Sequence, residues 1–83
     1  MASKATATPK ITGEQARVMR EKAGVNQSGF WNPVGVTQSG GSRYESGRTI
    51  STPVRLLLAL RYGSAAQKRQ AREFIGLREA VEE

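Results

Sequence analysis

The stretch VGVTQSGGSRYESGR, residues 34–48, decides how the whole chain is interpreted. Thr37 can cap a helix that runs on to about Ser46, because a hydroxyl side chain satisfies free N–H groups of the first turn. Inside this helix stand two adjacent glycines, Gly40 and Gly41, and each costs about 1 kcal/mol relative to alanine at an interior position. We therefore expect the absence of side chains to be either useful or tolerated for a structural reason.

Start and stop signals on both sides of this stretch predict an all-α chain of five short helices. The expected starts are residues that can cap a helix, namely Thr12, Asn26, Thr37, Thr52 and Ser64. The expected stops are Gly24, Gly35, Gly47 and Gly63, of which the first three are expected to need a positive φ. Pro33 predicts a distorted or short last turn in the second helix, because proline has no N–H to donate. The fifth helix is expected to continue through Gly76, with an apolar face made of Phe74, Ile75, Leu77 and Val81.

Composition limits the classes of protein to which the chain can belong. Its 83 residues suffice for one small domain, which we place at residues 11–83 behind a flexible, disordered arm at residues 1–10. The chain has no Cys and no His, so disulfides, thiolate metal sites and the commonest general base are excluded. We therefore expect no enzyme activity, no metal and no cofactor.

The charge balance points to a polyanionic partner. The net charge is +6, and such a surplus suits either nucleic acid or an acidic membrane surface, while the alternative from charge alone is a soluble basic protein without a polyanionic partner. Membrane binding is the weaker alternative, because the basic residues do not gather opposite one long apolar face. No apolar run approaches spanning length and the first ten residues lack the apolar core of a secretory signal, so a cytoplasmic, nucleoid-associated location is expected.

Several linked motifs resemble the lambda-repressor/Cro-type helix-turn-helix family, also called the XRE family. They are AGVNQ at 23–27, VGVTQS at 34–39, SRYESGR at 42–48 and LLLAL at 56–60. The resemblance covers about residues 12–63 and implies a compact five-helix, lambda-repressor-like DNA-binding domain. In that family the helix that starts here near Thr37 enters the major groove of double-stranded DNA.

The resemblance also implies which residues touch DNA. The expected base contacts are Gln38, Ser39, Ser42 and Arg43, and the expected phosphate contacts are Asn26, Gln27, Thr37 and Arg48. Gln38 can pair with both the N6 and N7 positions of adenine, while Arg43 suits guanine or, alternatively, a phosphate. Arg48 alternatively is a solvated loop charge. Because few side chains read bases, we expect a large share of the affinity to come from phosphates and to depend strongly on salt.

The same resemblance implies how the expected recognition helix packs on the rest of the domain. The expected contacts are an ion pair between Arg20 and Glu45 and a contact in which Gln27 fixes the position of Gln38. The family has a small residue at the position of Trp31 and an aliphatic one at the position of Gly41. We expect a reciprocal exchange here, in which the indole fills the volume over the bare backbone. The alternative is that Trp31 is exposed and contacts a partner.

The function predicted from these features is sequence-specific DNA binding by a small transcriptional regulator, acting as a repressor. A palindromic operator and a homodimer through the C-terminal helix are expected, because one such helix reads only a few base pairs. The alternative for the apolar residues of that helix is that they cover the core of a monomer. The alternative function is an antitoxin-like protein that binds a partner protein and regulates its own operon.

Overall fold

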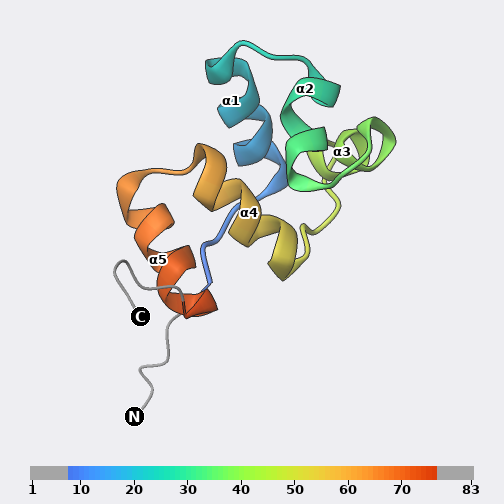
Figure 1. Ribbon diagram of the computed structural model, residues 1–83. Coiled ribbons are helices and arrows are strands. Elements are labelled where there is room, and N and C mark those ends of the chain that lie inside the picture. Colours follow the sequence, from blue (N-terminus) through green and yellow to red (C-terminus); the bar gives the residue numbers. More distant parts are fainter. Residues whose placement is uncertain (1–7, 77–83) are drawn as a thin grey trace.

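The computed structural model describes residues 8–76, and every regular element in that range is helical (Figure 1). The elements are α1 (Gly13–Ala23), α2 (Gln27–Trp31), the 3-10 helix η1 (Asn32–Val34), α3 (Gln38–Glu45), α4 (Thr52–Tyr62) and α5 (Ala65–Ile75). The predicted all-α class is therefore confirmed. Within the described range, no helix is both long enough and apolar enough to cross a membrane.

Local capping explains where most helices begin. Thr12 caps α1 as predicted and forms a capping box with Gln15, in which each side chain bonds to the backbone N–H of the other residue. Asn26 Oδ1 accepts the backbone N–H of Gly29 at 2.8 Å, and Thr37 Oγ1 accepts that of Gly40 at 3.1 Å. These bonds replace the partners that a first turn lacks, so they define the starts of α2 and α3.

The turn between α2 and α3 has the predicted irregular geometry. Pro33 lies in η1, where the chain tightens from α-helical to 3-10 form. Gly35 then adopts a left-handed conformation with φ 82°, which glycine reaches without steric cost. The backbone N–H of Val36 returns to the carbonyl of Trp31 at 3.1 Å, so the turn is held by the end of α2.

Two predicted helix boundaries need correction. The cap of α4 is Ser51, so Thr52 is the first helical residue and Pro53 follows within the first turn. The helix α5 does not continue through Gly76, because Gly76 is its left-handed cap with φ 88° and its N–H bonds back to Arg72 and Glu73. Phe74 and Ile75 are therefore in the last turn of α5. Leu77 and Val81, the other members of the expected apolar face, lie outside the described residues.

One apolar core joins the helices. Its buried residues are Ile11, Ala16, Phe30, Trp31, Val34, Ile50, Leu56, Leu58, Ala59 and Ala71. The rings of Phe30 and Tyr62 stack with centroids 4.2 Å apart, and the Tyr62 hydroxyl donates to the Phe30 carbonyl at 3.1 Å. This contact ties the end of α4 to α2. The helix α5 contributes only Ala71 to the core, so it lies against α4 at the edge of the molecule.

Part of the expected flexible arm packs against α4. Pro9 is fully buried, and Arg55 donates from Nε to the Pro9 carbonyl at 3.0 Å and from Nη2 to Thr8 Oγ1 at 3.1 Å. A third bond runs from Arg55 Nη1 to the Ile50 carbonyl at 2.6 Å. Of the expected arm the structure thus describes residues 8–10, while residues 1–7 lie outside the described range.

A glycine sets the distance between α1 and α3. A Cβ atom built on Gly13 would overlap the backbone carbonyl of Tyr44. The first turn of α1 therefore touches the last turn of α3 backbone to backbone, which only glycine permits. Tyr44 itself is half-buried and packs on the core. These contacts fix α3 against the rest of the fold.

Candidate nucleic-acid interface

The helix α3 lies at one end of the molecule (Figure 1), and the residues on its two sides differ in exposure. Gln38, Ser39 and Arg43 are exposed and Ser42 is half-buried, whereas Gly41 is buried against the fold. The four residues predicted to contact bases thus lie on the outer side of α3. The inner side rests on α1 and α2, in the helix-turn-helix arrangement formed by α2, η1 and α3.

The paired glycines have different environments. A Cβ on Gly41 would lie 2.7 Å from Trp31 Nε1 and closer still to two other ring atoms, and Trp31 is 0% exposed. The predicted packing of the indole over Gly41 is therefore confirmed, and the alternative of an exposed Trp31 is wrong. Gly40 is half-buried, and a Cβ there would meet Val36 at 3.1 Å.

The carboxylate of Glu45 holds the inner side of α3. Arg20 donates to it from Nε to Oε2 at 2.8 Å and from Nη2 to Oε1 at 2.9 Å, which is the two-pronged pairing that guanidinium geometry favours. Trp31 Nε1 donates to Oε2 at 2.8 Å, and Gln27 Nε2 donates to Oε1 at 3.1 Å. Each oxygen therefore accepts two hydrogen bonds. The carboxylate joins α1, α2 and α3 at one point.

These contacts also change the acid–base behaviour of the pair. Burial by itself would raise the pKa of the Glu45 carboxyl, whose side chain is 5% exposed. The hydrogen bonds from Arg20, Trp31 and Gln27 and the charge of Arg20 outweigh burial and lower this pKa below the usual value for Glu. The hydrogen bond to Glu45 raises the pKa of Arg20 further above its already high value. Both groups are therefore charged at neutral pH.

A chain of side-chain contacts runs from this part-buried pair to the surface. Gln38 Nε2 donates to Gln27 Oε1 at 2.6 Å, so the contact implied by the family resemblance is present. Gln38 keeps its Oε1 and one N–H free for another partner. A polar hollow beside them is lined by Arg20, Asn26, Gln27, Ser28 and Gln38. It places three expected DNA-contacting residues around one exposed depression.

The remaining residues predicted to touch phosphate lie elsewhere or have other tasks. Thr37 and Asn26 use a side-chain oxygen to cap their helices, which leaves the Thr37 hydroxyl hydrogen and the Asn26 amide N–H groups as donors. Arg48 is exposed beyond the other end of α3 and lines a different hollow, together with Gly13 and Arg55. The structure therefore does not group Arg48 with Asn26 and Gln27.

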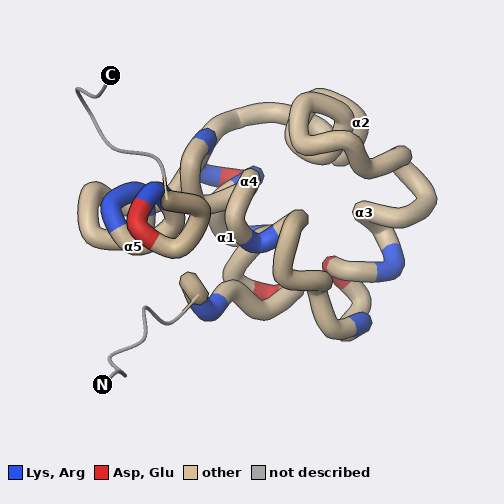
Figure 2. The backbone as a smooth tube through the Cα atoms, turned by 60° about the horizontal axis from the view of Figure 1, so that its bottom comes forward, with Lys and Arg blue, Asp and Glu red and all other residues tan. Residues whose placement is uncertain are grey.

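Positive charge is sparse on the helix-turn-helix and dense on α5. The segment 26–47 contains one cation, Arg43, and one anion, Glu45, whose charge Arg20 compensates. Figure 2 shows α2 without a charged residue, and it shows cations clustered on α5 at the other end of the molecule. Direct contacts from the outer face of α3 must therefore be made mainly by neutral polar groups.

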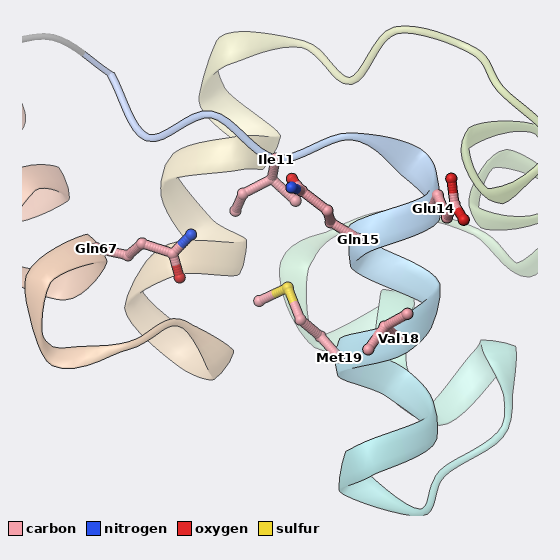
Figure 3. A pocket seen from close by; sticks show the side chains of 6 residues that line it. All are labelled: Ile11, Glu14, Gln15, Val18, Met19 and Gln67. Atoms are coloured by element: carbon pink, nitrogen blue, oxygen red, sulfur yellow. The ribbon is translucent and has the colours of Figure 1, made fainter.

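A second hollow lies between α1, the segment before it and α5 (Figure 3). Its lining is mostly apolar and comprises Ile11, Glu14, Gln15, Val18, Met19 and Gln67. Met19 from α1 and Gln67 from α5 point into it. Glu14 is its single ionisable side chain, so this hollow contains no pair of groups suited to acid–base chemistry. In residues 8–76 no cluster of acidic side chains suits a metal ion.

Sequence reasoning missed two contacts in this region. One is the hydrogen bond from Trp31 to Glu45, and the other is the backbone contact between Gly13 and Tyr44. Both contacts join residues that are distant in sequence, so no local sequence pattern predicts them. The indole N–H of Trp31 was the one indication of the first contact, because a buried tryptophan usually donates to a hydrogen-bond acceptor.

Comparison with known families agrees with this geometry. The chain matches the RsaL-like HTH domain over residues 17–61, which is more than half of its length and runs from α1 to the end of α4. The helix α5 lies beyond the matched residues. No curated protein and no solved structure gives a significant match to the chain. On the strength of the matched range, the chain belongs to the RsaL-like helix-turn-helix family of DNA-binding domains.

Proposed function

We propose that this protein is a small transcriptional regulator that represses by inserting α3 into the major groove of a specific DNA site. The observation that carries the proposal is the contrast between the two sides of α3. Its inner side is locked by the contacts of Glu45, and its outer side presents free polar groups led by Gln38. A rigid helix with an open polar face is what direct reading of base edges requires.

The proposed contacts divide into two sets. Gln38, Ser39, Ser42 and Arg43 face base edges. Asn26, Gln27, Thr37 and Arg48 contact phosphates, with the first three near the start of α3 and Arg48 beyond its end. Phosphate contacts on both sides of a recognition helix fix its register on the duplex, while base contacts supply the sequence preference.

Two copies on a palindromic operator complete the proposal. The eight residues of α3 span too little of the groove to specify a long site, so a second copy one helical turn away is needed for selectivity. Phe74 and Ile75 are 45% and 44% exposed in the last turn of α5, which supports a homodimer through this helix. Such a repressor acts in the cytoplasm at the nucleoid.

A finer relationship to the lambda-repressor/Cro type is part of the same proposal. The ion pair of Arg20 with Glu45 and the bond of Gln38 to Gln27 support it, because the family resemblance implied both contacts. The alternative function, an antitoxin-like protein, is favoured by the same exposed Phe74 and Ile75. They lie at the opposite end of the molecule from α3, so a protein partner there leaves the recognition helix free.

Selection of bound duplexes from a random pool tests the proposal. We expect one enriched palindrome, bound by the wild-type chain with two copies per duplex. Arg43→Ala and Gln38→Ala should each weaken binding to it by about 1–3 kcal/mol while leaving the melting temperature nearly unchanged. Arg69→Ala on exposed α5 is the matched control and should bind like the wild type. Failure to enrich any sequence at low salt would refute the proposal, and an enriched site without symmetry would refute the homodimer.

A further inference from the structure

We propose that Glu45 and Trp31 decide which base Gln38 reads. They do so by fixing the orientation of the side-chain amides of Gln27 and Gln38, that is, which partner each amide oxygen and each amide nitrogen faces. This inference deepens the proposed function and rests on it. Glu45 and Trp31 are positioning residues here, since they lie on the inner side of the recognition helix and act through Gln27.

The first step is the chemistry of the Glu45 carboxylate. An ionised carboxylate only accepts hydrogen bonds, so the group that Gln27 turns toward it must be the Nε2 amide. Gln27 Nε2 lies 3.1 Å from Glu45 Oε1, and its other end, Oε1, therefore faces Gln38. The orientation of the Gln27 amide thus follows from the charge of a buried neighbour.

The second step passes this orientation to the surface. Because Gln27 offers an oxygen, Gln38 must donate one Nε2–H to it, which it does at 2.6 Å. Gln38 then has one acceptor, Oε1, and one N–H left for DNA. That combination matches adenine, which presents a donor at N6 and an acceptor at N7 in the major groove. Had the Gln27 amide pointed the other way, Gln38 would retain two N–H groups, the combination that matches O6 and N7 of guanine.

Trp31 keeps the Glu45 carboxylate in the position required by this relay, the hydrogen-bonded series Glu45–Gln27–Gln38. The indole is fully buried, sits directly over Gly41, and packs edge-on against Phe30 with ring centroids 5.2 Å apart. Its N–H therefore points in one direction, toward Glu45 Oε2 at 2.8 Å. With Oε2 filled by Trp31 and Arg20, the only remaining acceptor position for Gln27 is on Oε1.

The test uses the full chain and two variants that each lose a part-buried hydrogen bond; Tyr62→Phe also loses the exposed bond that its hydroxyl accepts from Arg61 Nε. Trp31→Phe removes the N–H to Glu45 but keeps an aromatic ring over Gly41. Tyr62→Phe is the matched control, because it removes the hydrogen bond to the Phe30 carbonyl in the same core and does not touch Glu45. Both are studied at a temperature where circular dichroism shows them folded.

The first readout needs no DNA. NMR signals of the side-chain amides of Gln27 and Gln38 should shift and broaden in Trp31→Phe and stay unchanged in Tyr62→Phe. Unchanged amide signals in Trp31→Phe, or equal changes in both variants, would overturn the inference. Because this measurement is made on the free protein, it decides the relay even if the proposed DNA binding fails.

The second readout is base preference at one position of the selected site, the position whose preference disappears in Gln38→Ala. The wild type should prefer adenine to guanine there, and Trp31→Phe should lower this preference by about tenfold, the scale of a good bidentate contact. Glu45→Gln should lower it as well, because an amide at this position donates as readily as it accepts. A wild-type preference for guanine, or the same loss in Tyr62→Phe, would overturn the inference.

Discussion

The helices at one end of this molecule pack through different interactions from those at the other end. At one end, α1, α2 and α3 meet at the Glu45 carboxylate, which accepts four hydrogen bonds. At the other end, α4 and α5 pack through apolar side chains, of which Ala71 is the buried member on α5. The α2–α3 unit is polar and nearly neutral. The α4–α5 unit carries five cations and one anion, namely Arg55, Arg61, Lys68, Arg69, Arg72 and Glu73.

This difference separates two tasks that a DNA-binding chain must perform. Reading bases requires donors and acceptors in fixed positions, and buried hydrogen bonds provide that directional control. General attraction to a polyanion requires only charge, which acts over several ångströms without fixed geometry. The candidate interface is therefore ordered by a part-buried ion pair, and the cations of α4 and α5 lie away from it.

The strongest test of the comparison removes the indole from the polar end. Trp31→Ala should destabilise the fold by about 3–5 kcal/mol, since it opens a cavity over Gly41. Leu57→Ala on α4 is the matched control, because Leu57 is 44% exposed, and it should change stability by less than about 0.5 kcal/mol. Urea unfolding followed by circular dichroism measures both.

The double variant Trp31→Ala with Gly41→Ile completes that experiment. An isoleucine at Gly41 refills part of the cavity, so part of the lost stability should return. If the double variant is no more stable than Trp31→Ala alone, the packing of the indole against the glycine is not a reciprocal exchange of volume.

A second test compares a part-buried ion pair with an exposed one. Glu45→Gln leaves Arg20 without its counter-charge and should cost about 3 kcal/mol in urea unfolding. Glu21→Gln breaks the pair with Arg17, whose charged atoms lie 3.9 Å apart with both side chains more than half exposed, and should cost less than about 0.5 kcal/mol. Equal losses would mean that the polar end is not held by Glu45.

Acid should act on the same residue with a smaller effect. The pKa of Glu45 is lowered in the folded chain, so its ionised form contributes stability above the ordinary value of 4.5. This contribution should disappear as pH falls through the lower folded pKa. Thermal unfolding between pH 7 and pH 2 should therefore show a smaller acid-induced loss in Glu45→Gln than in the wild type. Parallel curves for the two proteins would contradict the assignment.

The smallest effect concerns salt. Arg48→Ala should reduce the slope of log affinity against log salt by about 1, because the proposed function places Arg48 on a phosphate. Arg69→Ala on α5 should leave the slope unchanged. Fluorescence anisotropy on the selected duplex between low and physiological salt measures this. A reduced slope in Arg69→Ala would show that α5 also touches the duplex, and the division between the two ends would not hold.

Much of the fold follows from local chemistry that a single sequence carries. Thr12, Asn26 and Thr37 cap their helices because each side chain bonds to a backbone group three residues away, and such signals survive without knowledge of the fold. The contact of Trp31 with Gly41 was also predictable, because an unusually large and an unusually small residue occupied two positions that face each other in related domains.

Other features depend on tertiary structure. The end of α5 was placed too late because Leu77 and Val81 continue the apolar spacing past Gly76, although the glycine itself stops the helix. The attachment of Pro9 to α4 had no signal, since it depends on Arg55, 46 residues later in the chain. The meeting of four donors at Glu45 likewise arises only when three helices converge.

The chain has one tryptophan, and this has a practical consequence for optical measurements. Its ring is shielded from water, while its N–H donates to a carboxylate that connects through Gln27 to the exposed side chain of Gln38. Emission from that single fluorophore should respond both to unfolding and to ligands docking at Gln38. The protein thus contains its own label, and titrations with unlabelled duplexes can be followed without attaching a dye.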